Sequence, residues 1–229
     1  MIPMFYALVT SAATLAGGAA PLYTRLRRVE QRYLVAFAGG AMVAIALYDL
    51  IPAMASPHAL ALFLGFFSIY LLEKLVMIHT CGEIECETHT MGWPAMIGIA
   101  TESLLDGLAI AVGFQVEPVL GLLIALAVFV HEVPRGVATT VIMQQAGYGR
   151  AKIWLALLVD AGFAPLGVLL AGWLPAAAFE PLVGFTAGVF LYVGASDLLP
   201  EAHRRFNSRV VLATIFGALL IPALSLLLG

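Results

Sequence analysis

The chain has 229 residues, of which 62% are hydrophobic and only 11% are charged. A soluble domain carries about a quarter charged residues and must cover its surface with polar groups, so this composition excludes a soluble globular protein. The net charge of −3 gives no electrostatic basis for binding nucleic acid.

Apolar runs recur along the chain at the length of a membrane-spanning helix, roughly 20 residues. Short connections with Pro, Gly or charged residues separate them. In chain order the runs cover about 3–22, 33–53, 58–78, 93–114, 118–141, 153–173, 181–200 and 209–228. The sequence therefore predicts an all-α membrane protein with eight transmembrane helices in a single domain, 1–229.

Lysines and arginines lie near the end of the third predicted helix or after the first, fifth and seventh. They are Arg25, Arg27, Arg28, Arg32, Lys74, Arg150, Lys152, Arg204, Arg205 and Arg209. The opposite connections, near 56–58, 116–118 and 178–180, contain none. Because basic residues concentrate on the cytoplasmic side, we expect both termini outside, extracellular or periplasmic, and the 79–92 loop in the cytoplasm.

The second and seventh helices share a pattern of Phe, Gly, Asp, Leu and Pro at a constant offset of 148, from Phe37 to Pro52 and from Phe185 to Pro200. The predicted topology runs these two helices in opposite directions. An inverted repeat of three helices on each side of a central pair, a 3+2+3 arrangement, is typical of secondary transporters. It places Asp49 towards the outer face and Asp197 towards the inner face, as vestibule carboxylates.

Ionisable residues inside a membrane cost about 2.5–3.5 kcal/mol each, so they are usually functional. Glu102 and Asp106 are four residues apart, as are His131 and Arg135, so each pair shares one helix face. The two antiparallel helices bring these faces to similar depth, and Glu132 and Asp160 add further charges. Carboxylates with an imidazole suit Zn²⁺ or a similar divalent ion. A structural salt-bridge network around Arg135 is the alternative.

Two motifs carry a family resemblance. Residues 102–107 read Glu-Ser-Leu-Leu-Asp-Gly and residues 131–136 read His-Glu-Val-Pro-Arg-Gly. They are similar to the patterns His-Asn-x-x-Asp/Glu-Gly and His-Glu-x-Pro-His/Glu-Glu of the ZIP (Zrt/Irt-like) family, and the resemblance extends over nearly the whole chain. It implies a prokaryotic divalent metal transporter, which works by alternating access through a mid-membrane site on the fourth and fifth helices.

The motifs depart from the family at the second of its two metal positions. Glu102 replaces the first His, Ser103 replaces the Asn, Arg135 replaces the residue that bridges two metals, and Ala164 stands where the sixth helix usually has Glu. A guanidinium keeps its charge, so we expect Arg135, held by Asp160 or Glu132, to act as a built-in cation.

The expected site is therefore mononuclear. Its ligands are Glu102, Asp106 and His131, with Glu132 as a further ligand. This oxygen-rich set favours Mn²⁺ or Fe²⁺ beside Zn²⁺ as cargo, Cd²⁺ is a further candidate, and no cofactor is expected.

The connection at 79–92 contains His79, Cys81, Cys86 and His89. The Cys-x4-Cys spacing is not that of a standard zinc finger, so a merely polar loop is the alternative to a metal-binding one. The resemblance favours a cytoplasmic metal-binding loop, because ZIP-like proteins often carry one there.

Two other functions compete with transport. The first is a non-transporting ZIP-like paralogue that senses metal or acts structurally, with Arg135 blocking the path. The second is an intramembrane metallohydrolase, which is disfavoured because Arg135 replaces the second histidine of His-Glu-x-x-His. We expect no enzyme, but a multi-pass protein of the bacterial or archaeal plasma membrane. Its expected partners are metal ions and the lipid bilayer; a homodimer is left open.

Overall fold

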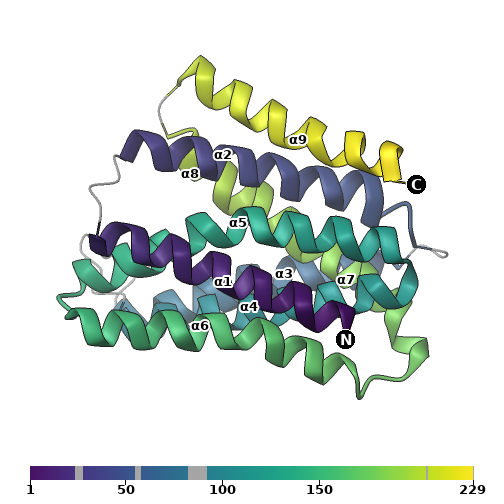
Figure 1. Ribbon diagram of the computed structural model, residues 1–229, viewed down its shortest axis with the longest axis horizontal. Helices are drawn as coiled ribbons and strands as arrows, with labels where there is room; N and C mark the ends of the chain where they lie inside the picture. The colour runs from purple at the N-terminus through teal and green to yellow at the C-terminus, as the bar shows by residue number, and fades with distance from the viewer. Residues whose placement is uncertain (24–27, 55–57, 82–91, 205, 229) are drawn as a thin grey trace.

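The computed structural model describes residues 1–229 except 24–27, 55–57, 82–91, 205 and 229, and only the backbone of 28–31, 76–81 and 92–95. Within the described part the chain is helical and contains no strand. The α-helices are α1 (Ile2–Tyr23), α2 (Arg28–Ile45), α3 (Ala59–Cys81), α4 (Gly92–Val116), α5 (Pro118–Gln145), α6 (Arg150–Ala171), α7 (Phe179–Leu191), α8 (Leu199–Ala202) and α9 (Ser208–Leu228) (Figure 1).

Membrane-length helices dominate the fold. Seven helical segments among the described residues are long and apolar enough to cross a bilayer, by length and composition. One of these is the continuous segment Ala176–Ala202, which contains α7 and α8. The helix α3 is an eighth, with 23 residues. The prediction of an all-α, multi-span membrane protein is therefore confirmed.

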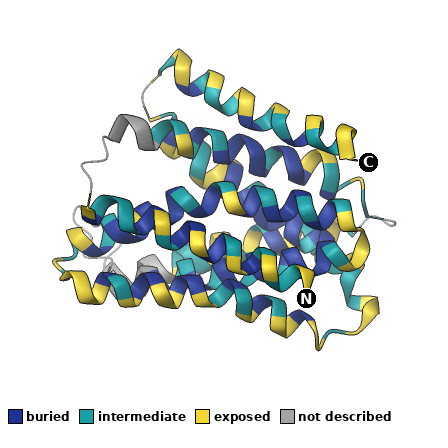
Figure 2. Ribbon diagram, viewed as in Figure 1, coloured by how far each residue is buried: buried dark blue, intermediate teal, exposed yellow. Residues whose placement is uncertain are grey.

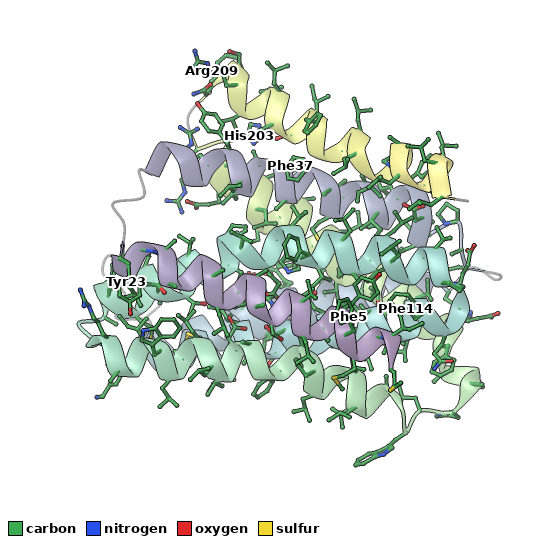
Figure 3. The ribbon with its side chains drawn as sticks, in the orientation of Figure 1. Phe5, Tyr23, Phe37, Phe114, His203 and Arg209 are labelled. Carbon is green, nitrogen blue, oxygen red and sulfur yellow. The ribbon has the colours of Figure 1, made fainter. Side chains whose placement is uncertain are left out.

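The helices lie side by side in one bundle. The helix α5 runs through its centre and packs against α1, α2 and α4, while α9 packs on α2 and α3 packs on α7. Figure 1 shows the N- and C-termini at the same end of the bundle. Figure 2 shows that α5 carries buried residues over much of its length, whereas α9 exposes its outer side. Sticks in Figure 3 place Tyr23, His203 and Arg209 at the end opposite the termini, where α6 also begins.

Reciprocal glycine contacts join α1 to α5 and α4 to α6. A Cβ on Gly17 would lie 2.2 Å from the carbonyl oxygen of Val133, and one on Gly136 would lie 2.1 Å from that of Thr14. On the other side, Gly167 and Gly107 approach the carbonyl oxygens of Leu104 and Ala164 in the same way, at 2.1 and 1.8 Å. Small residues at such crossings let membrane helices pack backbone to backbone.

These two pairs of contacts are copies of each other. Gly17 and Gly167 are 150 positions apart, and so are Thr14 and Ala164. Their contact partners also keep a constant offset, because Leu104 and Gly107 on α4 precede Val133 and Gly136 on α5 by 29 positions. A second duplicated set joins α2 to α9 and α7 to α3. Its contacts are Gly40 to Thr214, Gly217 to Phe37, Gly188 to Leu62, and Gly65 to Phe185, each from the glycine to a carbonyl oxygen.

The offsets are 148 positions from α2 to α7 and 152 from α3 to α9. Helices α1, α2 and α3 thus correspond to α6, α7 and α9, and α4 corresponds to α5. Each corresponding pair runs in opposite directions in Figure 1. This contact pattern is that of an inverted repeat around a central pair.

The expected spans at 33–53 and 181–200 are not regular α-helices throughout. Each turns into a π-helix near its end, η1 (Ala46–Leu50) after α2 and η3 (Tyr192–Leu198) after α7, and a 3₁₀ turn, η2 (Ala176–Ala178), precedes α7. A π-helical turn accommodates an extra residue, and such turns are frequent at functional sites. Asp49 and Asp197 lie in these two equivalent segments.

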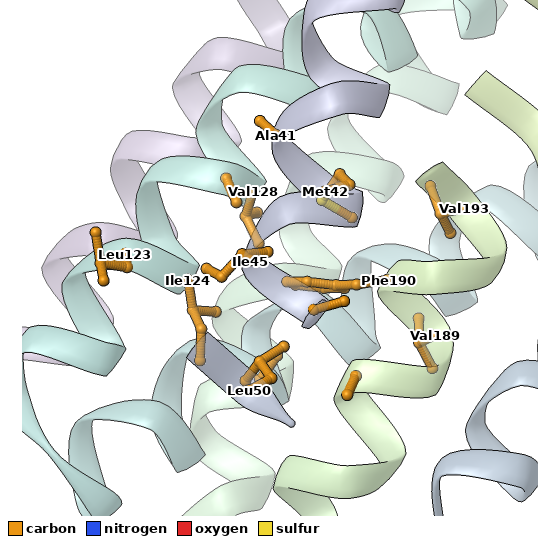
Figure 4. Close-up of a cluster of buried hydrophobic side chains, with 14 of the residues drawn as sticks. Ala41, Met42, Ile45, Leu50, Leu123, Ile124, Val128, Val189, Phe190 and Val193 are labelled. Carbon is orange, nitrogen blue, oxygen red and sulfur yellow. The ribbon is translucent and has the colours of Figure 1, made fainter. Parts of the chain in front are cut away.

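The apolar core lies between α2, α5 and α7. In Figure 4, Met42 and Ile45 of α2 meet Ile124 and Val128 of α5 on one side and Phe190 of α7 on the other. All five side chains are buried. This core fixes α5, and with it the polar residues further along the same helix.

Candidate metal site

Three buried donors from α4 and α5 converge inside the bundle. One ligand atom each from Asp106, His131 and Glu132 lies within 4.8 Å of the other two. The Nε2 atom of His131 is 3.3 Å from Oδ2 of Asp106. On the other side of the ring, Nδ1 lies 3.2 Å from the carbonyl oxygen of Ala127. A histidine that donates from one nitrogen to a backbone carbonyl presents the other to a metal, so this orientation suits a ligand.

The guanidinium of Arg135 lies among these donors. Its Nη1 donates to Oδ2 of Asp106 at 2.8 Å and is 3.3 Å from Nε2 of His131. Glu102 contributes an ion-pair contact, with Oε2 at 3.8 Å from Nη1. The second nitrogen, Nη2, pairs with Oε1 of Glu132. Arg135 therefore contacts all four predicted ligands instead of lying to one side of them.

Ser103 connects the guanidinium of Arg135 to Asp160. Asp160 on α6 is fully buried, and its Oδ1 accepts a hydrogen bond from the hydroxyl of Ser103. The same hydroxyl accepts a hydrogen bond from Nη2 of Arg135 at 2.6 Å. Of the two partners predicted for Arg135, Glu132 makes the ion pair, and Asp160 is connected to the arginine through Ser103.

Ala164 is buried against α4. Its carbonyl oxygen is the atom that approaches Gly107. The methyl side chain at 164 offers no metal ligand. The contact at Gly107 brings α6 close enough to α4 for Asp160 to reach Ser103.

The helix α1 contributes a residue that the sequence analysis missed. The hydroxyl of Thr14 donates to Oε2 of Glu132, so Glu132 is held from both sides, by Thr14 and by Arg135. The close approach of α1 and α5 at Gly17 and Gly136 makes this contact geometrically feasible. A signal existed in the sequence, because Thr10, Ser11 and Thr14 are polar residues in an otherwise apolar span, one to two turns before Gly17.

Ser11 satisfies a backbone group that proline leaves without a partner. Pro165 has no N–H, so the carbonyl of Ala161, four residues earlier, loses its helical hydrogen bond. The hydroxyl oxygen of Ser11 lies 2.5 Å from that carbonyl oxygen, closer than the 2.8 Å to the carbonyl oxygen of Ala7 in its own helix. A membrane helix tolerates proline where a neighbouring hydroxyl supplies the missing donor, so α1 stabilises the stretch of α6 that carries Asp160.

Comparison with known proteins decides the family. The sequence profile of the family described as "ZIP Zinc transporter" matches residues 78–225, which is more than half of the chain and includes α4 to α7. The chain belongs to the ZIP family. The matched region holds every residue of the site except Thr14.

Curated relatives of this ZIP chain include animal proteins. It is 31% identical to "Zinc transporter ZIP13 homolog" of Drosophila melanogaster over 59% of its length and 41% of the relative. It is 34% identical to the Homo sapiens protein "Zinc transporter ZIP13" over 48% of its length and 33% of that protein. With the Homo sapiens protein "Zinc transporter ZIP5" the identity is 38%, over 49% and 21% of the two chains. The chain thus spans less than half the length of each of these relatives. The ZIP family is one of transporters, in agreement with the prediction that the chain is not an enzyme.

The two carboxylates predicted to line vestibules differ in their surroundings. Asp49 in η1 is partly buried and lines a cavity of about 100 Å³ together with Glu117 and Ser225. Asp197 in the equivalent η3 is exposed. At the start of η3, the hydroxyl of Tyr192 donates to Oε2 of Glu73 at 2.6 Å. Glu73 was not predicted from the sequence, because it is a single acidic residue near the end of an apolar span.

The predicted metal-binding loop falls largely outside the described residues. Cys86 and His89 are not described, and of His79 and Cys81 only the backbone is, at the end of α3. The metal-binding prediction for these four residues therefore stays a prediction.

Proposed function

We propose that the protein transports divalent metal ions, with Zn²⁺ as the principal cargo, through a site on α4 and α5. One observation supports this most directly. Asp106, His131 and Glu132 present three buried ligand atoms within 4.8 Å of one another, inside a membrane-length bundle whose sequence matches the ZIP family. Buried ionisable groups at this depth are costly and usually functional, and relatives carry the name zinc transporter.

The proposed site holds one ion per chain. Asp106, His131 and Glu132 are its ligands, and Glu102 is a fourth whose carboxylate faces the same space. Arg135 supplies a fixed positive charge, and Ala164 supplies no ligand where a second metal would need one. Three carboxylates and one imidazole accept Zn²⁺ and also Cd²⁺, Fe²⁺ and Mn²⁺.

Alternating access between the two halves of the inverted repeat is the proposed mechanism of uptake. An ion bound between α4 and α5 becomes accessible to one side and then the other as the repeats move. Both termini face outwards in this proposal, so Asp49 attracts ions from outside and Asp197 receives them inside. The basic residues Arg150, Lys152 and Arg209 lie at the end opposite the termini, which supports this orientation through the positive-inside rule.

Uptake into proteoliposomes tests the proposal. Purified protein should take up Zn²⁺ or Cd²⁺, and Asp106→Asn should reduce the initial rate at least tenfold, because it removes a charged ligand from the centre of the site. Glu180→Gln is the control and should transport normally, because Glu180 is an exposed carboxylate in the first turn of α7. Titration should give one tightly bound ion per chain. Two tightly bound ions would refute the mononuclear site.

A non-transporting ZIP-like protein is the second candidate, and the position of Arg135 favours it. Its guanidinium contacts each of the four proposed ligands, and a fixed cation there opposes the passage of another. Binding of Cd²⁺ without uptake by the wild-type protein would establish this candidate instead. A metallohydrolase is not favoured: among the histidines whose side chains are described, His58 and His203 lie near helix ends, away from His131.

A further inference from the structure

The arginine and a metal ion compete for the same carboxylates. A bound Zn²⁺ would lie about 2.0–2.2 Å from its oxygen and nitrogen ligands. Arg135 already donates to Oδ2 of Asp106 at 2.8 Å and to Oε1 of Glu132, and it is 3.3 Å from Nε2 of His131. An ion bound to these atoms and a guanidinium in contact with them would repel each other strongly in a buried site. Metal binding therefore favours movement of the guanidinium away from the ligands.

Asp160 is an anion placed to receive the arginine. It lies on α6, ten residues from the start of that helix at Arg150, and Arg135 lies ten residues from the end of α5 at Gln145. The two residues are thus at the same depth. Ser103 links them, since its hydroxyl accepts from Nη2 of Arg135 and donates to Oδ1 of Asp160. The arginine is separated from this carboxylate by a single hydroxyl group.

Asp160 and Arg135 both have unused hydrogen-bonding capacity. Within the described part of the chain, Oδ2 of Asp160 and Nε of Arg135 are buried and have no hydrogen-bond partner. An ionisable side chain that is fully buried, as Asp160 is, is stable in a membrane when it is paired. An arginine can satisfy a carboxylate with two parallel hydrogen bonds, and Nε–H is one of the donors that such a pair uses.

We propose that Asp160 is a positioning residue that takes Arg135 from Asp106 and Glu132 when a metal ion binds. In one position the guanidinium pairs with Asp106 and Glu132, as in this structure. In the other it pairs with Asp160, and Asp106, Glu132 and His131 bind the ion. The arginine stays paired in both positions, so metal binding leaves no isolated guanidinium in the bilayer. The inference rests on the proposed metal site, but not on transport itself.

Metal binding to the purified protein tests this exchange. Titration of wild type with Cd²⁺ gives the reference affinity. Asp160→Asn should weaken binding about tenfold, because the displaced arginine loses its second anionic partner; Asp160→Glu should restore the affinity to within threefold. Arg135→Gln should bind Cd²⁺ more tightly than wild type, because no tethered cation competes.

The double variant separates exchange from a merely structural role. In the Arg135→Gln background, Asp160→Asn should change the affinity less than twofold, since no arginine remains to be received. Such non-additivity is the signature of residues that act through each other. If Asp160→Asn weakens binding by the same factor in both backgrounds, or has no effect in wild type, the proposal is wrong.

A spectroscopic measurement covers the case in which Asp160→Asn does not fold. In wild-type protein with ¹⁵N-labelled arginine, the Nε–H resonance of Arg135, assigned with Arg135→Lys, should move on saturation with Cd²⁺ as Nε gains a carboxylate partner. An unchanged resonance at saturation would overturn the proposal. Binding of Cd²⁺ without uptake would refute transport and leave the exchange intact, so the two failures are distinguishable.

Discussion

The crossing of α4 and α6 offers a sharp test of how the site is held together. A Cβ on Gly107 would lie 1.8 Å from the carbonyl oxygen of Ala164, whereas real Cβ atoms essentially never approach closer than 3.0 Å. The obstacle is backbone, so Gly107→Ala must push the two helices apart by roughly an ångström. Overpacking of this kind costs about 1–3 kcal/mol, although alanine gains up to about 1 kcal/mol over glycine in a helix.

The net expectation for Gly107→Ala is a loss of about 1–2 kcal/mol. At about 2–4 °C per kcal/mol for a chain of this size, the unfolding midpoint in detergent should fall by several degrees. The separation also draws Asp160 away from Ser103, so Cd²⁺ affinity should change as well.

Gly162→Ala on α6 is the matched control. Apart from the nearby backbone of its own helix, no described atom lies within 4 Å of a Cβ built there, so the same substitution should be neutral or slightly stabilising. Equal midpoints for the two variants would refute the argument that backbone contact at Gly107 sets the distance between α4 and α6.

Two further substitutions test the contribution of α1. Thr14→Val removes the hydrogen bond to Glu132. Because hydrogen bonds to charged groups contribute about 1.5–3 kcal/mol, Cd²⁺ affinity should fall about tenfold or more. The control is Thr10→Val, which should bind Cd²⁺ normally, because the hydroxyl of Thr10 bonds to Ala7 in its own helix. Ser11→Ala should lower the unfolding free energy by about 1 kcal/mol, since the carbonyl freed by Pro165 loses its donor, and an unchanged midpoint would contradict that role.

The helices and the depth of the charged residues could be predicted from the sequence, because both depend on local patterns. Apolar runs of spanning length mark the helices, and the four-residue spacing of Glu102 and Asp106 places them on one face whatever the tertiary fold. The proximity of α4 and α5 followed from their short connection. These features are properties of adjacent stretches of chain.

The contacts that hold the site together depend on helices distant in sequence. Thr14 reaches Glu132 because α1 and α5 cross at two glycines. No local sequence pattern predicts that these two helices are in contact. The conversion of regular helix to π-helix around Asp49 and Asp197 was likewise not visible in hydropathy, which does not distinguish α from π turns. The orientation of Arg135 depended on where four carboxylates lie, which only the folded bundle decides.

The inverted repeat relates the arginine to one of the proposed ligands. The offset of 29 that relates the glycine contacts of α4 and α5 also pairs Glu102 with His131, Ser103 with Glu132, and Asp106 with Arg135. The ion pair between Asp106 and Arg135 thus joins equivalent positions of the two halves. One half places an anion there and the other a cation.

Two carboxylates at these equivalent positions could hold two metal ions, as the family resemblance implies for relatives. With Arg135, one of those positive charges is covalently attached to the protein. In the proposed site, a single mobile ion exchanges places with this tethered charge. The proposed chemistry of this ZIP protein therefore depends as much on where Arg135 goes as on which residues bind the metal.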